Sequence, residues 1–409
     1  ASPQRPVRQG AVRRGAQPAP PAMPQSEVPA SGGGLGVPRS GLLAAAAGSL
    51  LAVLLAAVRQ PLPAAAPPEG GLQEASRSRG SSAPEIPLVD LAGLRAGTPS
   101  AVAALAAAAR GHGVARLTRH GVGVEAARRA GRDYFALPLH LKGCPGCSVR
   151  NATLGLQRGY IPFAAESGLA DVLEVKEGFC YGLEWPAGRP AAHPYHGSNV
   201  WPPREALQEL RPDWKATMEG FYGEAVEVSQ LVVASLAEGL ELERGAQLRR
   251  LCEGGEGISQ MRLFHYLPPP PESEKRCLGS SPHTDWHVVT VISRDEASAL
   301  QYVDRWTGEW ANVTVGDDEL VLLVGDWLSA YSAGEFHSAA HRVQLPERNS
   351  SLAFVFFFNP SPEARLPQGA RQASLGRDGD SLNSVEQSFF ELPWGEYVVQ
   401  KWAKVMSNR

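Results

Sequence analysis

A run of short apolar segments between residues 258 and 358 limits most narrowly what this chain can fold into. Apolar and other residues alternate there with a period of two, and turn-forming sequences such as Pro268–Pro271, Thr307-Gly308 and Gly325-Asp326 separate the segments. A period of two is typical of β-strands, whose successive side chains point to opposite faces. The strands predicted on this basis are Ile258–Leu267, His287–Ile292, Leu300–Val303, Glu319–Leu323, Ala340–Val343 and Ser351–Phe358. Many short strands with regular turns predict a sandwich or jelly roll.

The segments that flank this region predict helices and two further strands. Residues 99–110 form an Ala-rich stretch that ends before glycine, a second helix precedes Pro138, and Trp394–Met406 predicts a closing helix. Short strands are predicted at Ile86–Leu91 and Val114–Leu117, whereas residues 140–203 are expected to be irregular. One further helix carries an apolar stripe that predicts core packing, formed by Trp214, Met218, Phe221, Ala225, Val228, Val232 and Leu236. The expected fold class is therefore mainly β with flanking helices (α+β).

Residues 1–83 differ in composition from the rest of the chain. They are rich in Ala, Pro, Gly, Ser and Arg, with almost no aromatic residues, so they cannot bury enough apolar surface to offset chain entropy. We expect a disordered tail. Within it, the uncharged stretch Ser40–Val58 and the small residues of Leu62–Ala66 follow an arginine-containing, acid-poor segment, which predicts a targeting segment at residues 40–66. The expected destination is an organelle, plastid-like; alternatives are a membrane anchor at residues 40–58 and a plain cytoplasmic tail.

Charge and cysteine content limit the classes of partner and compartment. The formal net charge of -3 predicts no bulk attraction to nucleic acid. We also expect a monomer. Five cysteines argue against a disulfide scaffold and suit a reducing compartment. Cys144 and Cys147 have metal-like spacing, but no second pair completes a zinc site, so we expect a turn with two thiols.

A candidate metal site lies within the predicted strands. His283 and Asp285 are two residues apart at the expected start of a strand, so their side chains should point to the same side. His341 lies on a later strand, which a jelly roll can bring alongside. Two His and one Asp leave three metal positions open, as in non-haem Fe(II) oxygenases, whereas a structural zinc site needs four protein ligands. His337 competes with His341 for the second position, and His287 also lies close.

A candidate anion site follows the metal motif. Arg348 and Ser350 are two residues apart, so on a strand they would share a face, and an Arg fork beside a hydroxyl suits a carboxylate. The alternative is a surface arginine in a loop. Candidate pocket walls, each of which is more often ordinary core, are Trp286, His287, Tyr302, Trp310 and Tyr331.

In this order of motifs the chain resembles the iron- and 2-oxoglutarate-dependent dioxygenases of the isopenicillin N synthase-like class. The resemblance covers roughly residues 84 to 406. It is carried by Ile86–Leu91, Gly111–Val114, His120–Val122, Phe135–Pro138, Lys176–Phe179, Arg262–Tyr266, His283–Asp285, Gly325-Asp326, Ser338–Val343 and the Arg348/Ser350 pair. It implies a distorted double-stranded β-helix (jelly roll) core at residues 258–362. An N-terminal dioxygenase region at 84–204, a core-packing helical segment at 205–257 and a C-terminal extension at 363–409 would surround that core.

The resemblance also implies roles for particular residues. His341 is preferred to His337 because it belongs to the His-Arg-Val triplet of the family. Arg348 and Ser350 correspond to an Arg-x-Ser pair that holds the co-substrate, and Tyr266 to a tyrosine that helps to hold it. Three departures are visible: Ser351 competes with Ser350, Phe264 replaces a common asparagine, and His287 replaces a common glycine.

The implied activity is oxidation of a small molecule, by hydroxylation or desaturation, with release of succinate and CO2. The implied cofactors are Fe(II), 2-oxoglutarate and O2, with ascorbate as a supporting reductant. Two alternatives remain open at this point: an iron oxidase of the same fold that does not use 2-oxoglutarate, and a catalytically silent binding protein.

Overall fold

The computed structural model describes residues 85–166, 171–295, 299–368, 370 and 386–407. The chain divides into two compact units, Ala1–Arg77 and Ser78–Arg409, and all the described residues lie in the second. The predicted tail and its targeting segment at residues 40–66 therefore lie outside the described residues. Within the described residues, none of the helices has the length and apolar character that crossing a bilayer requires.

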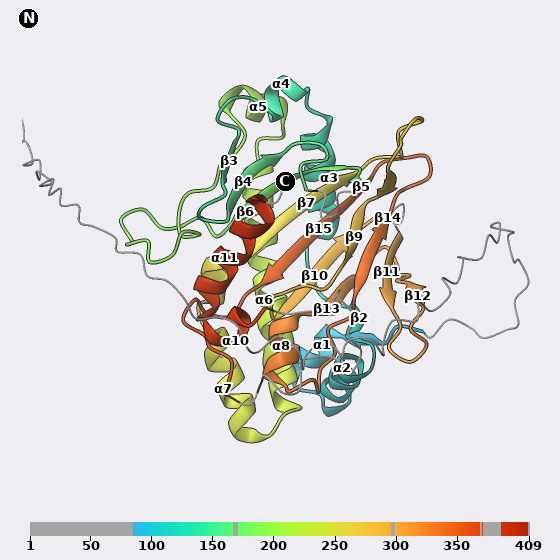
Figure 1. Cartoon of the computed structure of the whole chain (residues 1–409), viewed down its shortest axis with the longest axis vertical. Helices are drawn as coiled ribbons and strands as arrows, with labels where there is room; N and C mark the ends of the chain where they lie inside the picture. Colours follow the sequence, from blue (N-terminus) through green and yellow to red (C-terminus); the bar gives the residue numbers. More distant parts are fainter. Residues whose placement is uncertain (1–84, 167–170, 296–298, 369, 371–385, 408–409) are drawn as a thin grey trace, which may run out of the picture. The chain divides into compact units, whose positions relative to one another are not determined.

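Two β-sheets form the centre of the described unit (Figure 1). The larger sheet has nine strands, in the order β1 (Leu88–Asp90), β2 (Val114–Thr118), β13 (Leu320–Val324), β10 (Val289–Arg294), β15 (Ser351–Phe358), β7 (Gln260–Tyr266), β6 (Lys176–Gly182), β4 (Leu156–Ile161) and β3 (Ser148–Asn151). The smaller sheet has the order β12 (Trp310–Asn312), β11 (Ala299–Val303), β14 (His341–Gln344) and β9 (Ser280–His283). A separate parallel pair joins β5 (Val172–Glu174) to β8 (Arg276–Leu278).

Eight strands from the C-terminal half confirm the predicted jelly-roll core. Antiparallel β13, β10, β15 and β7 occupy adjacent places in the larger sheet, and antiparallel β12, β11, β14 and β9 form the smaller one. The N-terminal half extends the larger sheet at both ends, because β2 pairs with β13 and β6 pairs with β7.

The alternation along β15 separates two apolar cores. Phe354 and Phe356 belong to the core shared with the helices, whereas Ala353 and Val355 belong to the core between the two sheets. Helix α6 (Trp214–Glu238) packs against β10 and β15 on the helical side, and all seven residues of its predicted stripe are buried. The remaining helices are α1 (Leu91–Arg95), α2 (Pro99–Gly111), α3 (Val124–Ala136), α4 (Leu139–Lys142), α5 (Arg204–Glu209), α7 (Leu242–Cys252), η1 (Gly255–Ile258), α8 (Asp326–Tyr331), α10 (Ser388–Glu391) and α11 (Trp394–Ser407).

The expectation that residues 140–203 are irregular is wrong. Strands β3, β4, β5 and β6 lie there, and β6 is buried along its whole length. The charged residues Lys176 and Glu177 interrupt the apolar pattern that would predict this strand. Both are nevertheless buried, in ion pairs with Glu174 and Lys142 respectively. Such pairing makes the burial of charge tolerable, yet it depends on contacts that the local sequence does not display.

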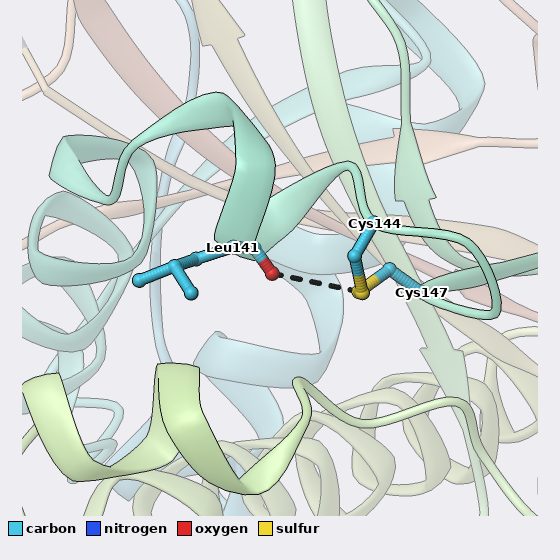
Figure 2. Close-up of a disulfide and its surroundings, with 3 residues drawn as sticks. All are labelled: Leu141, Cys144 and Cys147. Atoms are coloured by element: carbon cyan, nitrogen blue, oxygen red, sulfur yellow. Dashed lines mark hydrogen bonds between the residues drawn. A yellow bond between two sulfur atoms is a disulfide. The ribbon is translucent and has the colours of Figure 1, made fainter.

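Cys144 and Cys147 are joined by a disulfide across the turn after α4 (Figure 2). The expectation of two free thiols is therefore wrong. The turn brings their Cα atoms to 5.1 Å, within the range that a disulfide spans. The Cys147 sulfur also lies 3.4 Å from the carbonyl oxygen of Leu141, at the end of α4. The bond thus ties the end of a short helix to the start of β3.

Candidate active site

Three side chains that are distant in the sequence meet where the smaller sheet ends. His283 is the last residue of β9 and His341 the first of β14, and the two are paired across these strands. Asp285 lies beyond β9, and its Oδ1 is 3.6 Å from Nε2 of His283 and 3.7 Å from Nε2 of His341. The three ligand atoms lie within 4.8 Å of one another, and no other such group is found among the described residues. His337 is not part of it.

The position of Asp285 differs from the expected one. The sequence predicts His283 and Asp285 at the start of one strand, whereas β9 ends at His283 and Asp285 occupies the following turn. The convergence therefore comes from the turn, not from strand alternation. The same revision shifts the next predicted strand, since β10 begins at Val289 rather than His287.

Backbone carbonyls orient both imidazole rings. Nδ1 of His283 lies 2.7 Å from the carbonyl oxygen of Ser281, and Nδ1 of His341 lies 3.1 Å from that of Ala339. A carbonyl oxygen only accepts hydrogen bonds, so we assign the ring hydrogen to Nδ1 in each case. The Nε2 lone pairs then face Asp285, which is the arrangement that metal-binding histidines adopt.

The ionisation of the site suits a cation. Burial alone would raise the pKa of Asp285, but the neighbouring His341 and His283 rings outweigh it and hold the pKa below its ordinary value. Burial, followed by the charge of His283, lowers the pKa of His341 to about 4. Asp285 is thus an anion and His341 a neutral ring near neutral pH.

The donor set fits a divalent iron ion. Two imidazole nitrogens and one carboxylate oxygen converge from one side, which leaves positions for other ligands, and a closed zinc site would need a fourth protein donor. His283 gives access to the site, because 43% of its side chain is exposed whereas Asp285 and His341 are buried.

Asp326 connects the two segments that carry the three residues. Its Oδ2 accepts a hydrogen bond of 2.9 Å from the Thr284 hydroxyl, and its Oδ1 accepts one of 2.6 Å from Ser338. Its backbone N–H also donates to the carbonyl of Asp285 at 2.7 Å. Burial raises the pKa of Asp326 to about 6. In the sequence, Gly325-Asp326 indicates only a turn and a family motif, and nothing local reveals that Asp326 bridges these two segments.

The predicted anion site is arranged differently from the expectation. Tyr266 is buried at the end of β7 and pairs in register with Ser351, the first residue of β15. Arg348 and Ser350 are exposed in the loop before β15, so the prediction that they share a strand face is wrong. The strand begins at Ser351, as predicted from the period-two pattern, so both residues of the Arg348/Ser350 pair lie before it. Of the two competing serines, only Ser351 is buried beside Tyr266.

The candidate pocket aromatics have different surroundings. Trp286 is partly buried and contacts Trp402 edge to face, with ring centroids 5.2 Å apart. His287 is buried next to Phe357 and Trp394. Burial lowers the pKa of His287 to about 4, so its ring is neutral. Both residues belong to the turn that carries Asp285.

The remaining candidates, Tyr302, Tyr331 and Trp310, contact other residues of the protein core or surface. Tyr302 is buried opposite His341 in the β11–β14 register, and its hydroxyl lies 3.3 Å from Nδ1 of His112. The Tyr331 hydroxyl donates to the carbonyl of Arg244 at 2.6 Å, so Tyr331 packs against α7 and its placement in the pocket is not supported. The guanidinium of Arg342 lies 4.1 Å from the ring centroid of Trp310.

Arg262 is a further charged residue near the site, and the sequence assigns it no role beyond its place in the Arg262–Tyr266 motif. It is buried on β7, forms an ion pair of 2.7 Å with Glu166, and lies over the ring of Trp402 at 4.3 Å. Its charge also lowers the pKa of His287. The sequence feature that could have identified Arg262 is the presence of a charged residue inside an otherwise apolar strand.

Comparisons with known proteins agree with this geometry. The non-haem dioxygenase N-terminal model (morphine synthesis) matches residues 86–204, and the 2OG-Fe(II) oxygenase superfamily model matches residues 258–360. The 2-oxoglutarate-dependent dioxygenase citB of Monascus ruber is 31% identical over 287 residues, which are 69% of this chain and 82% of that protein. Gibberellin 20 oxidase 2 of Oryza sativa is 30% identical over 308 residues, covering 71% and 74% of the two chains.

Solved structures show the same fold. A full-length Neurospora crassa protein in complex with alpha-KG matches with a TM-score of 0.60 at 19% identity, over 78% of this chain and 96% of that one. A 2OG-Fe(II) oxygenase family protein from Caulobacter crescentus matches with a TM-score of 0.60 at 23% identity, over 78% and 99% of the chains. With the family models, the curated relatives and the His-Asp-His cluster in agreement, this chain belongs to the 2OG-Fe(II) oxygenase superfamily and is a 2-oxoglutarate-dependent dioxygenase.

Proposed function

We propose that His283, Asp285 and His341 bind the Fe(II) of this dioxygenase, and that the enzyme hydroxylates or desaturates a small organic molecule at that iron. The observation that carries the assignment is the convergence of the three ligand atoms within 4.8 Å. The carbonyl contacts of both Nδ1 atoms support it, because they leave Nε2 of each ring available to a metal ion.

Bound Fe(II) would supply the oxidation chemistry, in which O2 is consumed, 2-oxoglutarate becomes succinate and CO2, and the substrate is oxidised. The chain itself supplies geometry and shielding. Thr290 orients the Asp285 carboxylate, and Asp326 holds the segments of Thr284 and Ser338 together. Tyr266 and Ser351 are proposed to contact the co-substrate, since their buried hydroxyl groups lie on paired strands.

Two observations support a small organic molecule as the substrate. The exposed part of the site is the side chain of His283, and Trp286, which follows Asp285 in the sequence, is a partly buried aromatic residue that could offer an apolar contact to a substrate. Related proteins are named for, or bound to, small molecules: clavatol oxidase of Penicillium crustosum, the Neurospora crassa protein with thymine, and JOX2 with JA. We therefore propose a small, at least partly apolar organic substrate rather than a macromolecule.

The metal assignment is tested by anaerobic Fe(II) titration of the purified protein and two variants. His341→Ala should lose at least about 10-fold in Fe(II) affinity, because a direct ligand is removed. His337→Ala is the matched control: it lies four residues earlier in the same segment, and its backbone N–H is held by the carbonyl of Ala109. Equal Fe(II) affinity of His341→Ala and the wild type would refute the assignment.

The reaction is tested with carbon-labelled 2-oxoglutarate, Fe(II) and ascorbate. A panel of small cyclic and aromatic compounds should include some that stimulate the release of labelled CO2 and of succinate in equal amounts. Substrate oxidation without labelled CO2 would contradict the use of 2-oxoglutarate in that reaction. Asp285→Ala should abolish the stimulated release.

A further inference from the structure

A buried arginine lies on the face of β10 that looks toward the metal-binding residues. Alternate residues of a strand share a face, so Thr290, Ile292 and Arg294 point the same way. The Thr290 hydroxyl donates to Asp285, and Ile292 belongs to the apolar core between the two sheets. Arg294 therefore projects into the space between the sheets, at the other end of the strand from Asp285.

The surroundings of Arg294 support this placement. Its side chain is buried and donates to the carbonyl oxygen of Val313, a residue of the core between the sheets. Its positive charge acts on Tyr266, where it opposes the burial that raises the pKa of that hydroxyl. The sheets thus enclose a cation close to the tyrosine that the family resemblance links to the co-substrate.

Three adjacent strands bring their polar groups together here. Strand β15 lies between β7 and β10, and its Ser351 pairs with Tyr266 while its Ala353 pairs with Arg294. Tyr266, Ser351 and Arg294 thus lie at the same end of three neighbouring strands. Ser351 is completely buried, and its hydroxyl oxygen has no hydrogen-bond partner among the described residues. A buried hydroxyl without a partner is costly, which points to a ligand that completes it.

Arg348 does not reach this place in the structure. It is exposed and lines a surface pocket together with Gln344, Glu347 and Asn349. Because β15 begins at Ser351, the residue two before it, Asn349, occupies the position from which an Arg-x-Ser arginine would enter. The chain has an asparagine there, and an arginine on the neighbouring strand β10 instead.

We propose that Arg294, together with Tyr266 and Ser351, binds the distal carboxylate of 2-oxoglutarate, the role that the family resemblance implies for Arg348. A guanidinium fork binds a carboxylate through two parallel N–H groups, and a buried carboxylate requires such a partner. The inference rests on the proposed iron site, since the other end of the co-substrate would chelate the metal. It places the anchoring cation on β10 rather than at the start of β15.

The test measures binding, not turnover. 2-Oxoglutarate and 2-oxopentanoate, which has a methyl group in place of the distal carboxylate, are titrated anaerobically into the Fe(II)-loaded protein and followed by the visible absorbance of the chelate. The wild type should prefer 2-oxoglutarate, and Arg294→Gln should reduce that preference by about 10- to 100-fold, as expected for hydrogen bonds to a charged group. Arg348→Gln should retain the preference.

Further variants make each outcome decisive. Arg294→Lys keeps the charge without the fork, so it should show an intermediate preference with unchanged affinity for 2-oxopentanoate; it also replaces Arg294→Gln if that variant fails to fold. A preference that survives both Arg294 variants, or that is lost in Arg348→Gln, would overturn the inference. Failure of the wild type to bind Fe(II) would instead overturn the proposed iron site, so the two failures are distinguishable.

Discussion

The Thr290 hydroxyl donates a hydrogen bond of 2.5 Å to Oδ2 of Asp285, whose other oxygen, Oδ1, lies nearest the two histidines. Thr290 belongs to β10 of the larger sheet, whereas His283 and His341 belong to the smaller sheet. The Asp285 carboxylate therefore connects the two sheets through its two oxygens. The orientation of this proposed iron ligand depends on the larger sheet.

Removing that hydroxyl should weaken metal binding. Thr290→Val keeps the side-chain shape but leaves Asp285 Oδ2 without its donor, so Fe(II) affinity should fall by about 10-fold, as for other groups that orient metal ligands. Anaerobic Fe(II) titration measures the effect. Thr290→Ser retains the hydroxyl and should bind Fe(II) much like the wild type. An unchanged affinity in Thr290→Val would show that Thr290 does not orient the ligand.

A methyl group at Gly325 should disturb the turn that carries Asp285. A Cβ atom there would lie 1.9 Å from the carbonyl oxygen of His287, so the two backbone segments must separate. Gly325→Ala should lower the free energy of unfolding by about 1–3 kcal/mol and weaken Fe(II) binding as well. Urea denaturation and metal titration measure the two effects.

The matched control is Gly220→Ala in α6, where a Cβ meets nothing within 4 Å. That change should leave Fe(II) affinity unchanged and raise stability slightly, because alanine favours a helix. Comparable behaviour of the two variants would argue against a close approach at Gly325.

Glu177 should make the stability of the N-terminal half depend on pH. Burial alone would raise its pKa, but hydrogen bonds from His265, Lys142 and Tyr160 outweigh it and lower the pKa below the ordinary value. A carboxyl whose pKa is lowered on folding stabilises the protein above its unfolded-state pKa of about 4.3, and this contribution is lost as the pH falls through the folded-state pKa.

The corresponding variant is Glu177→Gln, which leaves the buried Lys142 without its anionic partner. It should lower the free energy of unfolding by about 3 kcal/mol at pH 7, and the difference from the wild type should shrink below about pH 4. Denaturant titrations followed by tryptophan fluorescence across this pH range provide the measurement. A difference that is constant with pH would contradict the role of the ionised carboxylate.

The disulfide between Cys144 and Cys147 should contribute little to global stability. The closed loop is very short, so a double Cys144→Ser and Cys147→Ser variant should lose at most about 2 kcal/mol of unfolding free energy. Fe(II) affinity should be unchanged, because neither cysteine belongs to the His-Asp-His cluster. Reduction of the wild type should reproduce the stability of the variant; a much larger loss would indicate that the turn organises β3 and β4.

Local sequence patterns were sufficient to predict the helices and strands in which one face is buried along the whole element. All residues of the α6 stripe are buried as predicted, and each strand predicted after residue 258 overlaps an observed strand with ends shifted by up to two residues, because burial on one face repeats regularly along the element. Strand β6 was missed because Lys176 and Glu177 look like surface residues, and only their distant partners make burial tolerable. The sequence does not predict a role for Arg294 for a similar reason, since its position near Tyr266 depends on strand pairing.

By itself the sequence determined the jelly-roll class, the family resemblance and the candidate residues His283, Asp285 and His341. These features are encoded by residue type, period and order along the chain, which need no knowledge of long-range contacts. Only the tertiary structure decided that Asp285 reaches the histidines from a turn, and that Arg348 is exposed while Arg294 is enclosed. The physical reason is that successive side chains of a strand point to opposite faces, so the pairing of β15 with β7 and β10 decides which side chains point inward, and that register is set by the packing of the whole sheet.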